Sequence, residues 1–292
     1  MIMDNLEFVK MHGAGNDFIM INCLKNKVSI SGKLTKKLCN RHKGIGADGI
    51  ISILPAENNN NDFKMRIFNS DGSEAEMCGN GIRCFAYYLY SQNITTQKKL
   101  NVETKAGIIK PEIKSDNNKN GLVRVNMGQP KFKAEQIPAI VKDDTDYIQD
   151  YKLQVNGNTF TINCVSMGNP HSIIFNKKID NLNLRKWGKK IENHPMFPEK
   201  TNVEFVQIYD RSNINIKVWE RGAGITMACG TGACASVAAG IKNNLLDSRV
   251  KVSLPGGDLF IDWSSEDIFM TGPAKIVFSG KIDLQEDQNG QF

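Results

Sequence analysis

Several features that mark whole classes of protein are scarce in this sequence. No run of apolar residues approaches the roughly 18 that a membrane-spanning helix requires. The opening stretch MIMDNLEFVKMHGAGNDF has no basic segment followed by an apolar one, so it does not resemble a signal peptide. We therefore expect a cytoplasmic protein that has no membrane partner.

Closely paired cysteines are also missing. The seven cysteines are an odd number, stand at positions 23, 39, 78, 84, 164, 229 and 234, and form no C-x-x-C motif. This spacing argues against a disulfide-stapled fold, a zinc ribbon or a thioredoxin-type site. The four histidines (His12, His42, His171 and His194) do not lie at metal-ligand spacing from the cysteines. We expect no metal and no other cofactor.

The charge is mildly positive and is not concentrated. Lys and Arg number 37 and Asp and Glu 31, which gives a net charge of +6. The basic clusters carry no interleaved aromatic residues and no nucleic-acid motif, so a solvated surface is the better interpretation. The excess of positive charge favours an anionic small-molecule substrate rather than a nucleic acid as the partner.

What the sequence does contain is an internal repeat. Residues 65–81, MRIFNSDGSEAEMCGNG, align without a gap on residues 216–232, IKVWERGAGITMACGTG, at a shift of 151. Three other landmarks keep shifts of 150 to 153: Gly15-Asn16 on Gly168-Asn169, His42 on His194, and Ala106-Gly107 on Gly256-Gly257. The order and constancy of these matches indicate a duplication into two similar domains, 1–128 with 272–292 and 129–271.

Short strands dominate both halves. Residues 7–22 predict two strands around a glycine turn, and Asn156-Gly157 predicts a β-hairpin. Helices are expected over 31–39, over 184–193 and after each C-G-x-G motif. The chain after Thr271-Gly272-Pro273 predicts one more strand that returns to the first domain. The fold class is α/β of the α+β type, with two pseudo-symmetric domains, each a mostly antiparallel sheet or barrel around a central helix.

Each repeat places a cysteine before a glycine-rich helix start. The helix after Cys229 is small and apolar all round, which is typical of a fully buried helix. The glycines beside Cys78 and Cys229 leave backbone N–H groups open to an anion, and the helix dipole adds positive potential there. We expect both thiols to have a depressed pKa. The other five cysteines are interpreted as small buried apolar residues.

Two equivalent thiols indicate a specific chemistry. If the two helix starts converge on one cleft, one thiolate removes a proton from a carbon while the opposite thiol returns a proton to its other face. This exchange inverts a stereocentre. The helix N-termini bind the adjacent carboxylate and stabilise the charge that develops as the proton leaves.

These motifs together resemble one known family. The segments MHGAGNDF, FNSDGSEAEMCGNGIRC, SMGNPH, TNVEF and WERGAGITMACGTGACA are similar to diaminopimelate epimerase, over residues 11 to about 274. The resemblance implies a cofactor-independent isomerase that interconverts LL- and meso-diaminopimelate in lysine and peptidoglycan precursor synthesis. It also implies a homodimer.

The resemblance carries over to individual residues. Cys78 and Cys229 match the catalytic cysteines, and the backbone of Gly79-Asn80 and Gly230-Thr231 matches the donors to the reacting carboxylate. The matched substrate contacts are Asn16, Asn69, Asn169, Asn202, Glu220 and Arg221. His171, together with Glu220, matches positions that support the site, whereas His42 and His194 are interpreted as structural. Two positions depart from the family pattern: Gly49 stands where some members carry Gln, and Phe278 where a dimer-interface Tyr often occurs.

Two alternatives stay open at this point. Proline and hydroxyproline racemases resemble the chain in fold and in the thiol pair, but their first motif usually has His where this chain has Asn80. The second alternative is a non-catalytic binding or redox protein, in which Cys78 and Cys229 form a regulatory disulfide.

Overall fold

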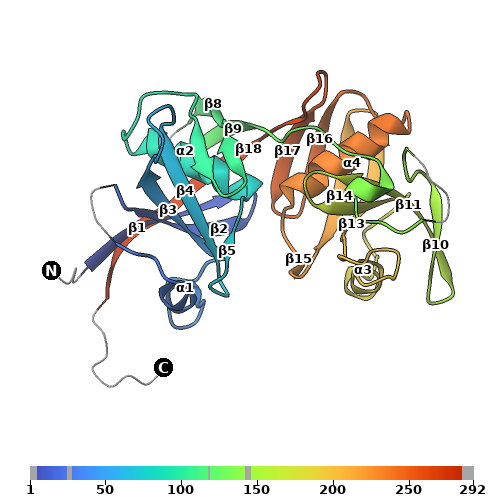
Figure 1. Ribbon diagram of the computed structural model, residues 1–292, viewed down its shortest axis with the longest axis horizontal. Coiled ribbons are helices and arrows are strands. Elements are labelled where there is room, and N and C mark those ends of the chain that lie inside the picture. Colours follow the sequence, from blue (N-terminus) through green and yellow to red (C-terminus); the bar gives the residue numbers. More distant parts are fainter. Residues whose placement is uncertain (1–4, 25–27, 118, 142–145, 285–292) are drawn as a thin grey trace. The chain divides into compact units, whose positions relative to one another are not determined.

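The computed structural model describes residues 5–24, 28–117, 119–141 and 146–284 (Figure 1). Their contacts divide the chain into two compact units. The first holds the described residues of Met1–Gly13, Asp17–Val123 and Ala274–Phe292, and the second holds Ala14–Asn16 and the described residues of Arg124–Pro273. The identity of these units as two epimerase domains, with the boundaries given above, stays a prediction.

The first unit contains most of the elements of the amino-terminal half. They are β1 (Asn5–Gly13), β2 (Asn16–Asn22), α1 (Gly32–Cys39), β3 (Gly49–Pro55), β4 (Phe63–Asn69), β5 (Glu74–Ala75), α2 (Gly79–Ser91), β6 (Val102–Thr104), β7 (Gly107–Ile109), β8 (Glu112–Asp116) and most of β9 (Asn120–Asn126). Most of the last strand, β18 (Phe269–Asp283), also belongs here and pairs antiparallel with β1. The predicted return of the carboxy-terminal strand is therefore confirmed.

The second unit repeats this order. It contains the short 3₁₀-helix η1 (Ala134–Gln136), β10 (Tyr151–Val155), β11 (Asn158–Ser166), β12 (Pro170–Phe175), α3 (Leu184–Glu192), β13 (Asn202–Asp210), β14 (Asn213–Glu220), β15 (Gly224–Ile225), α4 (Gly230–Lys242), β16 (Arg249–Leu254) and β17 (Gly257–Asp262). The start of β18 completes it by pairing with β17. Within the described residues, no helix has the length and apolar content needed to cross a membrane.

The strand pairing is the same in both units. In the first, β2 and β3 run parallel, β3 and β4 antiparallel, and β4 and β6 parallel. In the second, β12, β13, β14 and β16 follow the same sequence of directions. Phe18 pairs with Gly49 in the first register, and His171 pairs with Asn202 in the second, each 153 positions later. The predicted duplication is therefore visible residue by residue in the two sheets.

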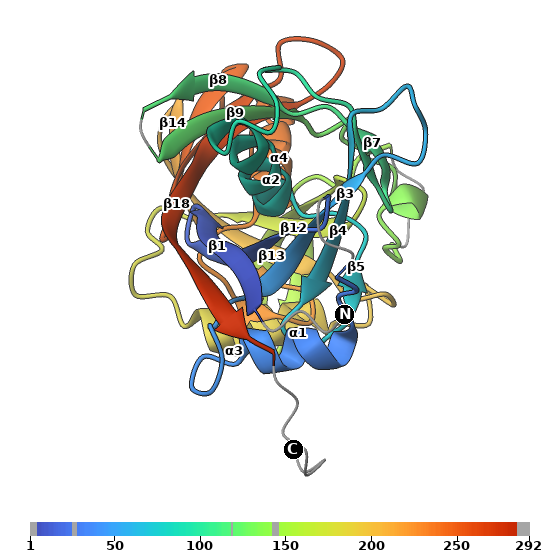
Figure 2. The same ribbon diagram turned by 90° about the vertical axis from the view of Figure 1, so that its left-hand side faces the viewer.

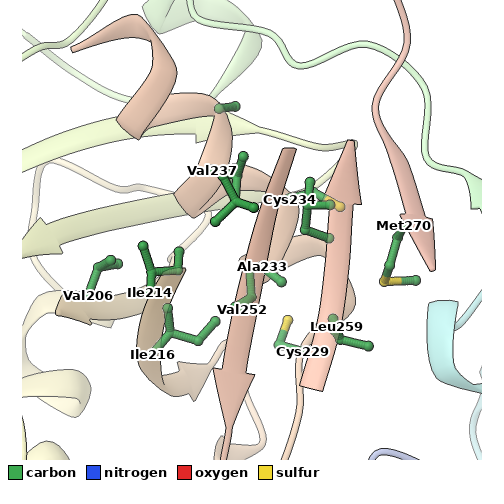
Figure 3. Packing of buried hydrophobic residues seen from close by; sticks show 14 of the residues in the cluster. Val206, Ile214, Ile216, Cys229, Ala233, Cys234, Val237, Val252, Leu259 and Met270 are labelled. Atoms are coloured by element: carbon green, nitrogen blue, oxygen red, sulfur yellow. The ribbon is translucent and has the colours of Figure 1, made fainter. Parts of the chain in front are cut away.

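Each sheet surrounds one helix. Figure 2 shows β1, β3, β4 and the β8–β9 hairpin around α2. In the second unit, α4 contributes six small residues that are at most 1% exposed: Ala233, Cys234, Ala235, Val237, Ala238 and Ala239. Figure 3 shows how side chains of β13, β14, β16 and β17 pack against them. Small side chains let the strands approach the helix closely, so the expected burial of this helix is confirmed.

A second helix covers the outer face of each sheet. In α1, Ser31 is the N-cap and its hydroxyl accepts a hydrogen bond from Leu34 N. In α3, the Asn183 side chain accepts from Lys186 N in the same way. Leu38 of α1 and Ile191 of α3 each lie in the apolar cluster between the outer helix and its sheet. Both helices form where the sequence predicts them.

The glycine turn and the hairpin are also confirmed. β1 and β2 are separated by Ala14 and Gly15, both with positive φ (53° and 84°). The β10–β11 hairpin turns at Asn156 and Gly157, whose φ values of 49° and 75° suit a type I′ turn.

A buried ion pair fixes the loop that precedes β3. The Lys10 ammonium, only 7% exposed as a residue, lies 2.7 Å from Asp17 Oδ2 and also donates to the carbonyl of Gly46. Arg41 donates to both oxygens of Asp17, at 2.7 and 3.1 Å, and the carboxylate also accepts from Asp48 N. Burial alone would raise the pKa of Asp17, but the hydrogen bonds from Arg41 and Lys10 and the charge of Lys10 outweigh it and hold that pKa well below its usual range.

We predict that Asp17→Asn destabilises the protein by about 3 kcal/mol, because the buried Lys10 ammonium loses its counter-charge. Urea unfolding measures the change. Because the pKa of Asp17 is lower in the folded chain than in the unfolded one, its stabilisation is complete above a pH of about 4 and is lost as the pH falls below that value. The control is Asp146→Asn, whose side chain is 94% exposed and 3.7 Å from Lys133. Equal effects of the two changes would contradict the prediction.

Candidate active site

Both cysteines of the repeat are N-caps of the central helices. Cys78 has φ −142° and ψ 121°, and its Sγ accepts a hydrogen bond from Gly81 N at 3.4 Å. Cys229 has φ −119° and ψ 112°, and its Sγ accepts from Gly232 N at 3.3 Å. The N–H groups of the first helical turn have no acceptor inside the helix, and here a sulfur takes the place of the usual side-chain oxygen. Each thiol therefore lies at the positive end of a thirteen-residue helix.

In the first unit, a buried arginine organises the start of α2. Arg83 is fully buried, and its guanidinium donates to Gly79 O at 2.9 Å and to Asn80 Oδ1 at 2.8 Å. A Cβ on Gly13 would lie 3.2 Å from Nη2 and 3.0 Å from Asn80 O, so glycine there makes room for this arrangement. The sequence reasoning did not identify Arg83. A charged residue inside a predicted buried helix was the available signal.

The other predicted residues of the first half lie at strand ends. Asn69 ends β4 opposite Gly49, and its side-chain amide donates to Ser73 Oγ at 3.0 Å. A Cβ at Gly49 would lie 2.5 Å from Phe68 O, so this backbone has no room for a longer side chain there without a shift. Asn16 begins β2 and is grouped with the second unit, where Gly15 packs beside Met227.

The second unit surrounds its thiol with ionisable side chains. Cys229 is 5% exposed. Its neighbours include Glu220, which shares a hydrogen bond with it and accepts another from Thr226 Oγ1 at 2.5 Å. Burial raises the pKa of Glu220; the Thr226 hydrogen bond opposes this, and the nearby Glu204 carboxylate adds to it.

The expected depression of the thiol pKa is wrong for Cys229. Burial raises its pKa well above the ordinary value, and the carboxylates of Glu220 and Glu204 raise it further. Hydrogen bonds from Thr231 and Gly232 lower it, but by less. The helix N-terminus does favour the thiolate, as the motif indicated. The sequence did not reveal that the fold places two carboxyl groups beside the sulfur.

A hydrogen-bonded row leads from a buried carboxylate to this sulfur. Glu204 Oε1 lies 2.7 Å from His171 Nδ1, and both side chains are fully buried. His171 Nε2 lies 3.0 Å from Asn169 Oδ1. Asn169 Nδ2 donates to Thr231 Oγ1 at 3.4 Å, and Thr231 Oγ1 lies 3.4 Å from Cys229 Sγ. The predicted residues Asn169, His171 and Thr231 are thus brought together, and Glu204 joins them without having been predicted.

Asn202 connects two strands of this site. Its Nδ2 donates to Pro170 O at 2.8 Å, and its Oδ1 accepts from Arg221 N at 2.9 Å, so the amide holds the backbone on both sides. Arg221 itself is exposed, and its guanidinium donates to Glu199 O at 3.1 Å. The 3% exposure of Asn202 shows that it holds the backbone from inside the sheet.

The remaining predictions concern the other cysteines and the structural histidines. Burial is confirmed for all five cysteines that were interpreted as apolar: Cys23, Cys39, Cys84, Cys164 and Cys234. Burial raises the pKa of Cys39 to about 11 and that of Cys84 to about 12, which keeps both protonated. His194 accepts from Met196 N, at the end of the segment that follows α3.

The glycine after each C-G-x motif provides a matched test. A Cβ on Gly232 would lie 2.6 Å from Glu204 Oε1 and 3.3 Å from the Cys229 sulfur, whereas one on Gly81 would meet the side-chain ends of Ile51 and Ile67 at 3.1 and 3.2 Å. Alanine favours a helix by up to about 1 kcal/mol over glycine at both positions. We predict that Gly232→Ala is less stable than Gly81→Ala by about 2 kcal/mol in urea unfolding, because a hydrogen-bonded carboxylate cannot yield as a methyl group can. Equal stabilities would contradict the packing described here.

Known proteins are similar to this sequence over nearly the whole chain. The family model described as diaminopimelate epimerase matches residues 8–133 and 163–277. The diaminopimelate epimerase of Halothermothrix orenii is 57% identical over 281 residues, which are 96% of this chain and 99% of that protein. That of Carboxydothermus hydrogenoformans is 51% identical over 283 residues, which are 96% of this chain and 100% of that one.

Solved structures with lower identity share the fold. A probable proline racemase from Agrobacterium radiobacter has a TM-score of 0.70 at 14% identity and covers 97% of this chain and 94% of its own. A hydroxyproline epimerase from Agrobacterium vitis has a TM-score of 0.67 at 14% identity, with 99% and 95% covered. With motifs, fold and sequence identity in agreement, the chain belongs to the diaminopimelate epimerase family.

Proposed function

We propose that this protein is a cofactor-independent isomerase that interconverts LL- and meso-2,6-diaminopimelate, with Cys78 and Cys229 as its acid–base groups. One observation carries the proposal. In each of the two repeated units, a cysteine caps the central helix through a hydrogen bond to its sulfur, and the chain belongs to the diaminopimelate epimerase family. The reaction serves the synthesis of lysine and of peptidoglycan precursors.

The chemistry requires one acid–base group on each face of the reacting carbon. A cysteine thiolate takes the proton from Cα, and the thiol of the other cysteine gives a proton to the opposite face. One C–H bond breaks and another forms, so the product differs from the substrate only in configuration. The reverse reaction uses the same two groups with their protonation exchanged.

The helix starts supply the stabilising charge. Removal of the Cα proton places negative charge on the substrate carboxylate, and N–H groups at a helix N-terminus are suited to bind it. We assign this role to the backbone of Gly79 and Asn80 in α2 and of Gly230 and Thr231 in α4. Arg83 supports it by holding Gly79 and Asn80 in place.

The remainder of the substrate needs polar contacts of both signs. We assign these contacts to Asn16, Asn69, Asn169, Asn202, Glu220 and Arg221. The exposed guanidinium of Arg221 suits the distal carboxylate, and Glu220 suits an ammonium group. His171 supports this site through Asn169. We also propose that Asn202 acts largely by holding the backbone of Arg221, since its Oδ1 accepts from Arg221 N.

Location and assembly follow as further proposals. We propose a cytoplasmic protein, which fits a sequence of seven cysteines without paired spacing, because thiols stay reduced in that compartment. We also propose a homodimer through β18, where Val277 and Phe278 are 51% and 47% exposed. Sedimentation of the purified chain tests the dimer.

The two thiols give the first prediction for activity. Cys78→Ala and Cys229→Ala each abolish epimerisation, because a single thiol cannot serve both faces of Cα, while circular dichroism shows an unchanged fold. Matched controls are Cys84→Ala and Cys234→Ala, which alter buried cysteines further along the same two helices and keep activity. We expect Cys78→Ala and Cys229→Ala each to lower kcat at least about 1,000-fold. Full activity of either variant would rule out the two-thiol mechanism.

The second prediction for activity concerns the substrate. Incubation with LL-diaminopimelate in deuterated water yields the meso isomer with deuterium at the inverted carbon, as mass spectrometry and chiral chromatography will show. L-proline and trans-4-hydroxy-L-proline undergo no exchange. Exchange with proline or hydroxyproline alone would instead favour a racemase of the kind found among the solved structures. No exchange with any of the three would favour a binding or redox protein.

A further inference from the structure

The buried carboxylate of Glu204 has no counterpart in the first unit. Glu204 pairs with Val218 in the β13–β14 register, and Ile51 pairs with Ile67 in the β3–β4 register, so Ile51 is its equivalent. In the same way, Phe18 is the equivalent of His171. One sheet thus packs two apolar side chains where the other buries a carboxylate and an imidazole.

Stability does not explain this pair. Burial of a carboxylate costs free energy that a hydrogen bond offsets only in part, and apolar residues of similar volume serve equally well or better in a core. Glu204 is 0% exposed, and its Oε2 has no hydrogen-bond partner within the described residues. Gly232, at the start of α4, also has to be a glycine to leave room for Oε1. A role in the site is therefore the better explanation for a fully buried carboxylate with one oxygen that accepts no hydrogen bond within the described residues.

The hydrogen bonds that lead away from Glu204 have a defined direction. Asn169 Oδ1 is a carbonyl oxygen and only accepts, so His171 Nε2 carries a hydrogen and donates to it. The second polar hydrogen of the pair then lies between His171 Nδ1 and Glu204 Oε1. Asn169 donates through Nδ2 to Thr231 Oγ1, which leaves the hydroxyl hydrogen of Thr231 free to point at the sulfur of Cys229.

We infer that Glu204 is a positioning residue that, through His171 and Asn169, orients the Thr231 hydroxyl as a donor to the Cys229 sulfur. This inference rests on the proposed function, because it requires that the sulfur of Cys229 receives and returns a proton. A donor on the sulfur stabilises the thiolate that forms when Cys229 takes the proton from Cα. In this scheme, Glu204 makes no hydrogen bond to the sulfur and does not contact the substrate.

Two variants of Glu204 separate orientation from packing. Glu204→Leu removes every hydrogen-bonding atom. Glu204→Gln keeps an amide that donates to His171 Nδ1 while His171 Nε2 still donates to Asn169. We expect Glu204→Leu to lower kcat for diaminopimelate by about 10- to 100-fold, the range found when the support of a reacting group is lost. Glu204→Gln retains most of kcat, and Ser172→Ala, a fully buried neighbour of His171 on β12, serves as the unaltered control.

A double-mutant cycle tests whether Glu204 acts through His171. In a His171→Gln background, Glu204→Leu causes no further loss of kcat, because the row of hydrogen bonds is already broken. A loss of the same size in both backgrounds, or an equal loss in Glu204→Gln and Glu204→Leu, would overturn the inference.

A spectroscopic readout stands apart from activity. In protein with ¹⁵N-labelled histidine, the N–H shared between His171 and Glu204 gives a downfield proton resonance that is present in the wild type and absent in Glu204→Leu and His171→Gln. Its persistence in Glu204→Leu would refute the pairing. If the wild type showed this resonance but did not epimerise diaminopimelate, the proposed function would fail while the pairing stood.

Discussion

The hydrogen bond from a helix N–H to a cysteine sulfur is the interaction on which the site depends. It fixes Sγ of Cys78 and Cys229 at the start of α2 and α4, where the dipoles of the helix favour negative charge. Two glycines stand in the first turn of each helix, Gly79 and Gly81 in α2 and Gly230 and Gly232 in α4. In the second unit, the small residues of α4 let the strands of the sheet pack closely around the helix that Cys229 caps.

The two units share a backbone plan but differ in the chemistry around their thiols. Asp48 and Asn202 illustrate how far the shared plan extends. In the first unit, the backbone of Asp48 donates to Asp17 O and accepts from Ser70 N. In the second, the side-chain amide of Asn202 makes the corresponding pair of bonds to Pro170 O and Arg221 N. The equivalent strand ends are joined by a backbone peptide group in the first unit and by a side-chain amide in the second.

Around the sulfurs the likeness ends. Cys229 has the carboxylates of Glu220 and Glu204 nearby, and Glu204 lies 2.7 Å from His171. In the first unit, Ile51 occupies the place of Glu204, and Phe18 occupies the place of His171. Buried carboxylates disfavour the thiolate, while the Thr231 hydroxyl and the Gly232 N–H favour it. The proposed two-thiol reaction needs one sulfur to give a proton while the other takes one. The buried carboxylates beside Cys229 raise its pKa, and the position equivalent to Glu204 in the first unit holds an isoleucine.

The sequence by itself determined the repeat, the central helices, the outer helices, the hairpin and both cysteines, because each depends on residues that are close in the chain or on a fixed shift between the halves. Glycine spacing and the position of a cysteine before a helix can be identified from the sequence alone. Only the tertiary structure decided the surroundings of the sulfurs. In the sequence, Glu204 looks like an ordinary residue of a strand, and Arg83 looks like an ordinary polar residue of a helix. The surroundings of Cys229 arise because strand register and helix packing bring a carboxylate of β13, an imidazole of β12 and the thiol at the start of α4 together. The pKa of Cys229 therefore depends on these neighbours as well as on its motif.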